Sequence, residues 1–497
     1  MAVTSDAGPR RHPLLAVFLS PGRYRSQVGL LLGPLLFTWV QLTPPPSGVP
    51  DTAWSVLALT LLMATWWITE ALPIAATALL PIALLPLMGV ETIQAAAAPY
   101  ANPLIFLFLG GFLLATAIQR WGLHRRLALA VLSLAGSRPD QVVGGFMVAT
   151  AMLSMWVSNT ATSALMLPIG LSVLGLLHPE DDREHRDNLG LCLLLGIALG
   201  ANIGGMGTLI GTPPNAVLAG YLASNHGITI GFGEWMLVAF PLAALLLFVA
   251  WWLLTRRIYP IEHIPIAHFD VLLDQQRQAM GSMSRPEKAV LGIFLLVAVA
   301  WLTRPLLQAA LPGLALSDAG IAVLGALLLF VIPVEWRPLR GLLDWSTAQQ
   351  LPWGVLLLVG GGLSLGGAIE SSGLAQQIAR ALYGLDGWPL VLIVAGLTLA
   401  VMLVSHVTSN TATAATMVPI AASLAITLEL PLITLTLPVA FAASCAFMLP
   451  VSTPPNAIIF SSERITIPQM ARAGAVLSLV AAATITVWVL VFSRFIS

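Results

Sequence analysis

Two short polar motifs each occur twice inside apolar segments of the chain, at fixed spacings. Ser-Asn-Thr-Ala-Thr occupies residues 158–162 and recurs 251 residues later, at 409–413. Thr-Pro-Pro-Asn-Ala occupies residues 212–216 and recurs 241 residues later, at 453–457. The chain therefore has two halves with the same plan, and each half supplies one copy of each motif.

These motifs can bind ions through neutral groups. Paired prolines remove two amide donors, so a helix must open at each Thr-Pro-Pro-Asn motif. An opened helix frees carbonyl oxygens for a cation, and helix N-termini present amide donors to an anion. Ser, Thr and Asn add groups that both donate and accept hydrogen bonds. No Asp, Glu, Lys or Arg lies within 141–177 or 389–428, so we expect a cage in which Na⁺ supplies the charge that attracts an anion. A single motif would more simply indicate helix–helix hydrogen bonding, but two copies in register favour a binding site.

The composition places these motifs in a membrane. Hydrophobic residues make up 58% of the chain and charged residues only 9%, whereas soluble domains have about 25% charged residues. A spanning helix needs about 20 apolar residues. We predict an all-α polytopic membrane protein with about eleven transmembrane helices. They start near Val28, Trp54, Pro73, Leu104, Leu189, Trp235, Ala289, Ala319, Trp353, Leu430 and Met470. Two further apolar stretches, about 141–177 and 390–428, are too long for one span and carry the Ser-Asn-Thr motifs in their middle, which predicts two re-entrant hairpins.

Basic residues set the expected orientation, because short cytoplasmic loops are rich in Lys and Arg. The basic clusters fall on one side if the N-terminus is cytoplasmic. The fourth and ninth spans match each other and are five spans apart, so the repeats are inverted, which is typical of secondary transporters. We expect a cytoplasmic tail at 1–25, a first half at 26–258, a cytoplasmic linker at 259–286 and a second half at 287–497.

With its doubled motifs, the sequence resembles the divalent anion/Na⁺ symporter family, whose members carry dicarboxylates, tricarboxylates or sulfate. The resemblance covers nearly the whole chain. It implies one sodium site at Ser154, Ser158, Asn159 and Gly211, and a second at Ser405, Thr408, Asn410 and Ser452. It implies substrate contacts from Asn159, Thr160, Thr212, Asn410, Thr411, Thr453 and Pro454.

The resemblance also implies an elevator-type transporter in the cell membrane, with Na⁺ as coupling ion and a homodimeric assembly. We expect import of C4-dicarboxylates such as succinate, malate or fumarate, and no enzymatic activity. The alternatives are a sulfate or tricarboxylate carrier and a sodium-independent dicarboxylate exchanger. An exchanger would need another positive charge, for which His406 is the nearest candidate. An intramembrane hydrolase would need a nucleophile and base. The adjacent Ser405 and His406 are poorly arranged for that, since neighbouring helical residues point about 100° apart.

Overall fold

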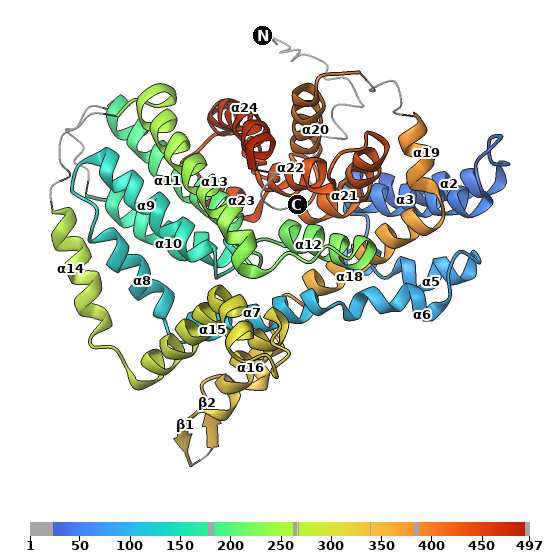
Figure 1. Ribbon diagram of the computed structural model, residues 1–497. Helices are drawn as coiled ribbons and strands as arrows, with labels where there is room; N and C mark the ends of the chain where they lie inside the picture. Colours follow the sequence, from blue (N-terminus) through green and yellow to red (C-terminus); the bar gives the residue numbers. More distant parts are fainter. Residues whose placement is uncertain are drawn as a thin grey trace, which may run out of the picture.

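A computed structural model describes residues 23–176, 183–261, 266, 268–337, 339–381 and 387–492. Most of the predicted N-terminal tail, residues 1–22, lies outside these described residues. The molecule is a bundle of helices with one small hairpin of strands at its edge (Figure 1). Both cysteines, Cys192 and Cys445, are buried free thiols.

The first half contains mostly long apolar helices with short ones between them. Its elements are α2 (Arg23–Leu42), α3 (Asp51–Thr69), α4 (Ile74–Thr77), α5 (Leu80–Leu87), α6 (Ile93–Ala97), η1 (Ala98–Ala101), α7 (Pro103–Arg120), α8 (Leu123–Leu132), α9 (Pro139–Ser154), α10 (Asn159–Leu174), α11 (Arg183–Gly205), α12 (Pro213–His226), α13 (Phe232–Leu253) and η2 (Leu254–Ile258).

The predicted linker contains a helix, α14, and the second half repeats the plan of the first. The remaining elements are α14 (Phe269–Met280), α15 (Arg285–Ala310), α16 (Asp318–Val331), β1 (Pro333–Trp336), β2 (Leu339–Gly341), α17 (Trp345–Ala348), α18 (Trp353–Ser371), α19 (Leu374–Ala381), α20 (Leu390–Ser405), α21 (Asn410–Thr427), α22 (Leu432–Ser444), α23 (Pro454–Phe460) and α24 (Ile467–Phe492).

Among the described residues, seven helical segments are long and apolar enough to cross a membrane. They include α3, α13, α15, α18 and α24. Other segments predicted as spans are shorter: α4 and α5 are separate pieces, α16 has 14 residues and α22 has 13. Many large apolar side chains on the long helices are exposed, among them Leu296 and Leu306 of α15. Such surfaces suit contact with lipid or another apolar partner rather than water.

The helices break where the sequence motifs predict. Helix α9 ends at Ser154 and α10 begins at Asn159, while α20 ends at Ser405 and α21 begins at Asn410. Helix α11 ends at Gly205 and α12 begins at Pro213, so the paired prolines open a new helix. A proline in the first turn is favourable, because its missing amide hydrogen would have no partner there anyway.

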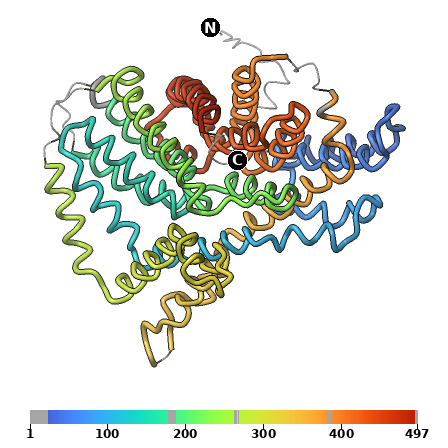
Figure 2. The backbone as a smooth tube through the Cα atoms, viewed as in Figure 1, coloured from blue at the N-terminus to red at the C-terminus, as the bar shows by residue number. Residues whose placement is uncertain are grey.

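Segments from the two halves pack against each other around these breaks. Helix α12 contacts α21 and α22, and α23 contacts α10 and α11. Figure 2 shows the green chain of α11 and α12 beside the red C-terminal segments. The four motifs are therefore drawn to one region of the molecule.

The antiparallel strands β1 and β2 depart from the all-α prediction. They form a hairpin that projects from the helical bundle next to α16 (Figure 1). Strands of four and three residues are too short to reveal the alternation of apolar and polar side chains by which strands are predicted.

Candidate functional site

The first Ser-Asn-Thr motif forms the turn between α9 and α10. Ser158 caps α10, and its hydroxyl accepts from the Ala161 amide at 3.3 Å. The buried Ser154 hydroxyl points at two acceptors, Asn159 Oδ1 at 2.5 Å and the carbonyl oxygen of Ala201 at 2.8 Å. The side chain of Asn159 is thereby held against α11.

The second motif repeats the serine–asparagine contact 251 residues later, although the side chain of Ser409 does not cap α21. The Ser405 hydroxyl lies 2.9 Å from Asn410 Oδ1 and 2.6 Å from the carbonyl oxygen of Ala443 on α22. Thr408 Oγ1 adds a contact of 2.5 Å to Thr413 Oγ1. In the first half the position of Thr408 is held by Val157, so the second turn carries one more hydroxyl.

One asparagine organises the loop in which α11 is interrupted. Asn215 is fully buried in the first turn of α12. Its Nδ2 lies 2.7–3.4 Å from the carbonyl oxygens of Gly205, Met206 and Thr208. A single amide thus satisfies carbonyls that the interrupted helix leaves without partners.

The repeat reproduces this arrangement. Asn456 Nδ2 donates to the carbonyl oxygens of Ala446 at 3.3 Å and Leu449 at 3.0 Å. These acceptors lie 241 residues after Gly205 and Thr208, the same offset that separates the two asparagines. The sequence repeat is therefore a structural repeat down to individual hydrogen bonds.

A link between the halves comes from Asn202, a buried side chain of α11. Its Nδ2 donates to Thr453 Oγ1 at 3.1 Å and to Asn456 Oδ1 at 3.2 Å. Its Oδ1 is buried without a hydrogen-bond partner among the described residues. Asn202 lines the cavity described next, so this oxygen is available to a bound ion, water or substrate group.

One cavity of about 770 Å³ collects most of the predicted site residues. Those that line it are Ser158, Asn159, Thr160, Gly211, Thr212, Asn410, Thr411, Ser452, Thr453 and Pro454. The other three, Ser154, Ser405 and Thr408, are buried and do not line it. The turns at 155–158 and 406–409 thus meet at one space.

The cavity is electrostatically suited to an anion although it has no basic side chain among its described lining residues. The helices α10, α12 and α21, of 14 to 18 residues, all begin at it. A helix N-terminus carries roughly half a positive charge, and α10 and α21 add unpaired amide donors, which the paired prolines at the start of α12 lack. The one charged lining residue, Glu70, is exposed at the end of α3. Arg120 donates to the lining residue Thr347 at 2.9 Å and is paired with the Asp344 carboxylate at 2.6 Å, so its charge is already balanced.

Behind the first turn, the side-chain amide of Asn159 and backbone carbonyl oxygens approach Gly205 and Gly211 closely. A Cβ atom on Gly205 would lie 2.8 Å from Asn159 Oδ1 and 3.2 Å from the carbonyl oxygen of Gly211. One on Gly211 would lie 2.4 Å from the carbonyl oxygen of Gly205. Neutral carbonyl and amide oxygens of interrupted helices are the ligands that sodium-coupled transporters use. The donor set at Asn159, Gly205 and Gly211 therefore fits a sodium ion.

His406 does not face the cavity. Its Nδ1 lies 2.6 Å from the carbonyl oxygen of Met402, and its Nε2 lies 3.5 Å from the hydroxyl of Ser478 on α24. Its own carbonyl oxygen accepts from the Ser452 hydroxyl at 2.9 Å. The His406 ring therefore points toward α24. Ser405 and His406 have different hydrogen-bond partners, whereas a catalytic nucleophile and its base would contact each other.

Several cavity residues were not predicted as site residues. Asn202 is an isolated asparagine in an apolar span, a pattern that itself marks a functional position, but it lacks a repeat partner. Gln119 and Gln350 line the cavity from α7 and the segment before α18.

Known sequences match this chain over nearly its whole length. The family model for the sodium:sulfate symporter transmembrane region matches residues 25–496. The chain belongs to this symporter family. The sodium-dependent dicarboxylate transporter SdcS of Staphylococcus aureus strain USA300 is 43% identical over 464 residues, which cover 92% of this chain and 89% of that protein. SdcS of strain MW2 is 44% identical with the same coverage.

Solved structures with similar folds are also transporters. The YdaH transporter of Alcanivorax borkumensis aligns with a TM-score of 0.57 at 14% identity, over 88% of this symporter and 98% of that chain. MtrF of Neisseria gonorrhoeae, from a class of antimetabolite efflux pumps, aligns with a TM-score of 0.54 at 14% identity, over 95% and 96%. At this identity the likeness concerns the fold alone.

Proposed function

We propose that this symporter imports C4-dicarboxylates, such as succinate, malate or fumarate, together with Na⁺. The observation that carries the proposal is the cavity shared by both Ser-Asn-Thr turns and both Thr-Pro-Pro-Asn motifs. The name and similarity of the SdcS proteins support sodium coupling and the dicarboxylate class. Sulfate or a tricarboxylate is the alternative cargo within the same family.

The two ends of a dicarboxylate match the two halves of the site. Asn159, Thr160 and Thr212 would bind one carboxylate, and the second-half residues Asn410, Thr411, Thr453 and Pro454 would bind the other. Each half offers a helix N-terminus and side-chain donors to one carboxylate. A cavity of about 770 Å³ holds such a molecule with water, since ligand sites measure about 300–1,000 Å³.

Sodium ions would supply the charge that the lining lacks. The first ion would bind Ser154, Ser158, Asn159 and Gly211, where the glycine-lined cradle supports it. The second would bind Ser405, Thr408, Asn410 and Ser452, where Ser452 takes the position of Gly211 and Ala446 that of Gly205. Because each ion lies beside a carboxylate position, binding of ion and substrate must be coupled, and linkage makes that coupling reciprocal.

The geometry also suggests how the substrate crosses. We assign the α9–α10 and α20–α21 pairs to re-entrant hairpins of an inverted repeat, in a homodimer of the cell membrane. The cavity lies at the Arg120 end of α7, the basic end. With the cytoplasmic N-terminus that we expect, this end would face the cytoplasm, and we assign the described conformation to the inward-facing state. An elevator motion of both hairpins would carry the site outward.

The decisive experiment measures substrate binding to the purified protein in Na⁺ and in choline, at matched ionic strength and pH. Succinate, malate, citrate and sulfate are compared. We expect succinate to bind tightly in Na⁺ and at least tenfold more weakly in choline. Equal affinities in both salts would refute symport and favour the sodium-independent exchanger. Preference for sulfate or citrate would refute the dicarboxylate assignment alone.

A further inference from the structure

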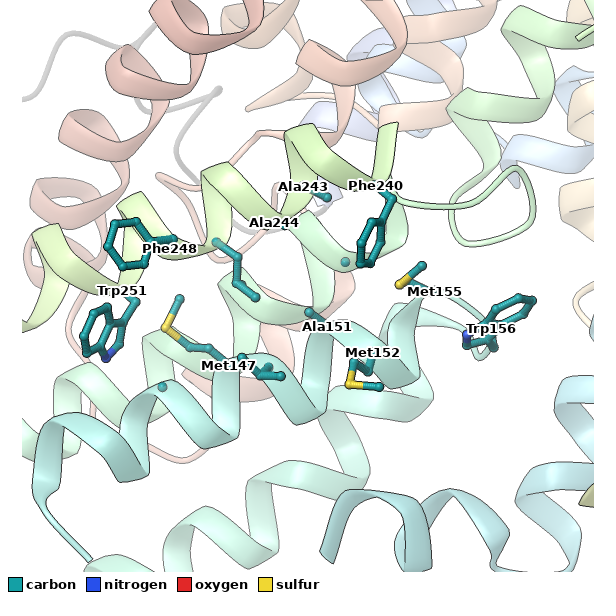
Figure 3. Close-up of a pocket in the computed structure, with 14 residues that line it drawn as sticks. Met147, Ala151, Met152, Met155, Trp156, Phe240, Ala243, Ala244, Phe248 and Trp251 are labelled. Carbon is teal, nitrogen blue, oxygen red and sulfur yellow. The ribbon is translucent and has the colours of Figure 1, made fainter. Parts of the chain in front are cut away.

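A second cavity, of about 580 Å³, lies between α9 and α13 and shares no lining residue with the proposed substrate site. Figure 3 shows its walls: Met147 and Met152 come from α9, and Phe240, Phe248 and Trp251 come from α13. All 14 residues that line it are glycine, alanine or larger apolar and aromatic residues. It cannot hold an anionic substrate, because burying a charge there would have no compensation.

The groove opens sideways and extends about as deep as one leaflet. Its rim residues Phe248 and Met152 are 60% and 51% exposed. Phe248 belongs to α13, which is long and apolar enough to cross a membrane, and Met152 belongs to α9. From Phe240 to Trp251 a helix rises roughly 16 Å, and half of the hydrocarbon core is about 15 Å. Small side chains, Ala151 and Ala244 among them, leave the space between the walls. Methionines adapt their shape to a flexible chain.

Basic side chains stand at the end of the groove near Trp251. The Trp251 indole donates to the Asp140 carbonyl oxygen at 2.8 Å. Arg138 and Arg256 both contact the Asp140 carboxylate, at 3.1 and 3.0 Å. Arg257 stacks on Trp252, with 5.5 Å between its guanidinium carbon and the ring centre. Two guanidinium groups share the Asp140 carboxylate and a third stacks on Trp252, so basic side chains gather at the end of the groove where we expect lipid headgroups.

We propose that this groove binds an anionic phospholipid, with one acyl chain between α9 and α13 and its phosphate at Arg256 and Arg257. Charge complementarity selects this occupant: a membrane surface attracts basic residues, and guanidinium groups recognise phosphate. The depth of the groove matches an acyl chain from the same leaflet.

The lipid would brace the first Ser-Asn-Thr turn. Met155 and Trp156, which precede Ser158, line the inner end of the groove. Trp156 also packs on Phe294 and Trp301 of α15, at 4.9 and 6.5 Å between ring centres. An acyl chain in this position would touch the turn and also Trp156, which packs on α15. The presence of the lipid would therefore alter the transport rate.

Native mass spectrometry of the purified full-length protein tests binding, with phosphatidylglycerol and phosphatidylethanolamine as probes. We expect one phosphatidylglycerol retained per chain in preference to phosphatidylethanolamine. Ala244→Phe fills the groove and should weaken retention about tenfold, since displacing two methylenes costs roughly that factor. Leu245→Phe, on the adjacent lipid-facing residue outside the groove, is the matched control and should bind as wild type.

Unchanged retention in Ala244→Phe, or loss of a dimer instead of a lipid, would overturn the proposal. Arg257→Gln should abolish the preference for the anionic lipid, and no preference in the wild-type protein would overturn the headgroup assignment. If Ala244→Phe does not fold, the wild-type protein in proteoliposomes is photolabelled with a diazirine phosphatidylglycerol. Label on residues 147–156 and 240–251 supports the site, and label confined elsewhere refutes it.

Discussion

Replacing Gly205 by alanine should damage the proposed first sodium site selectively. The added Cβ would lie 2.8 Å from Asn159 Oδ1 and 3.2 Å from the Gly211 carbonyl oxygen. Contacts this short force the asparagine to move by a few tenths of an ångström and place a methyl group where the ion would lie. Loss of one interaction with a charged group costs about 1.5–3 kcal/mol, so sodium affinity should fall roughly ten- to hundredfold.

The assay is the sodium dependence of succinate uptake into proteoliposomes, supported by sodium-dependent succinate binding. The sodium concentration for half-maximal uptake should rise in Gly205→Ala, and saturating sodium should restore much of the rate. Gly190→Ala is the matched control on the same helix, because its Cβ would meet only Leu174, at 3.8 Å. A wild-type sodium dependence in Gly205→Ala, with the protein folded, would refute the assignment of this cradle.

Three further predictions follow from the site. Thr160→Ala and Thr411→Ala should each weaken succinate binding by roughly ten- to hundredfold without lowering the unfolding temperature, since each loses a hydrogen bond to a carboxylate; calorimetric titration in Na⁺ checks this, and wild-type affinity in both would contradict it. Asn202→Ala should destabilise the fold by about 1–3 kcal/mol, because it leaves buried partners on the second half unpaired; an unchanged thermal unfolding midpoint would exclude that linking role. His406→Gln should keep sodium-dependent uptake, because the ring points to Ser478 and away from the cavity; loss of sodium dependence would restore the exchanger hypothesis.

The sequence could predict that the two turns lie together, because an internal sequence repeat implies equivalent positions in the fold. Two identical motifs at a constant offset imply two equivalent positions. Because the matching spans are an odd number of spans apart, the two repeats are expected to enter the membrane from opposite sides. Local rules also predict the helix breaks. Pro213 and Pro454 begin new helices because proline has no backbone N–H and its ring clashes with a preceding helical turn. The sequence alone therefore predicts that these residues lie together in the folded protein.

Features that depend on packing between distant segments could not be predicted in this way. Asn202 reaches the second half 251 residues away, yet the repeat offers no counterpart to mark it. The groove between α9 and α13 depends on Ala151 and Ala244 facing each other, and alanines are common throughout the chain. The interruption between α4 and α5 is likewise hidden in an apolar stretch that reads as one span.

The uncharged lining of the large cavity decides how transport responds to voltage. Apart from Glu70 on α3, no described residue there carries a formal charge, so the proposed moving site contributes no charge of its own. The current in each cycle is then the charge of the cargo. A dianion with two sodium ions is electroneutral, and a third ion adds one charge, which 100 mV of inside-negative potential favours by about 2.3 kcal/mol. Electrical recording would therefore report the number of sodium ions directly, and the empty carrier would return independently of voltage.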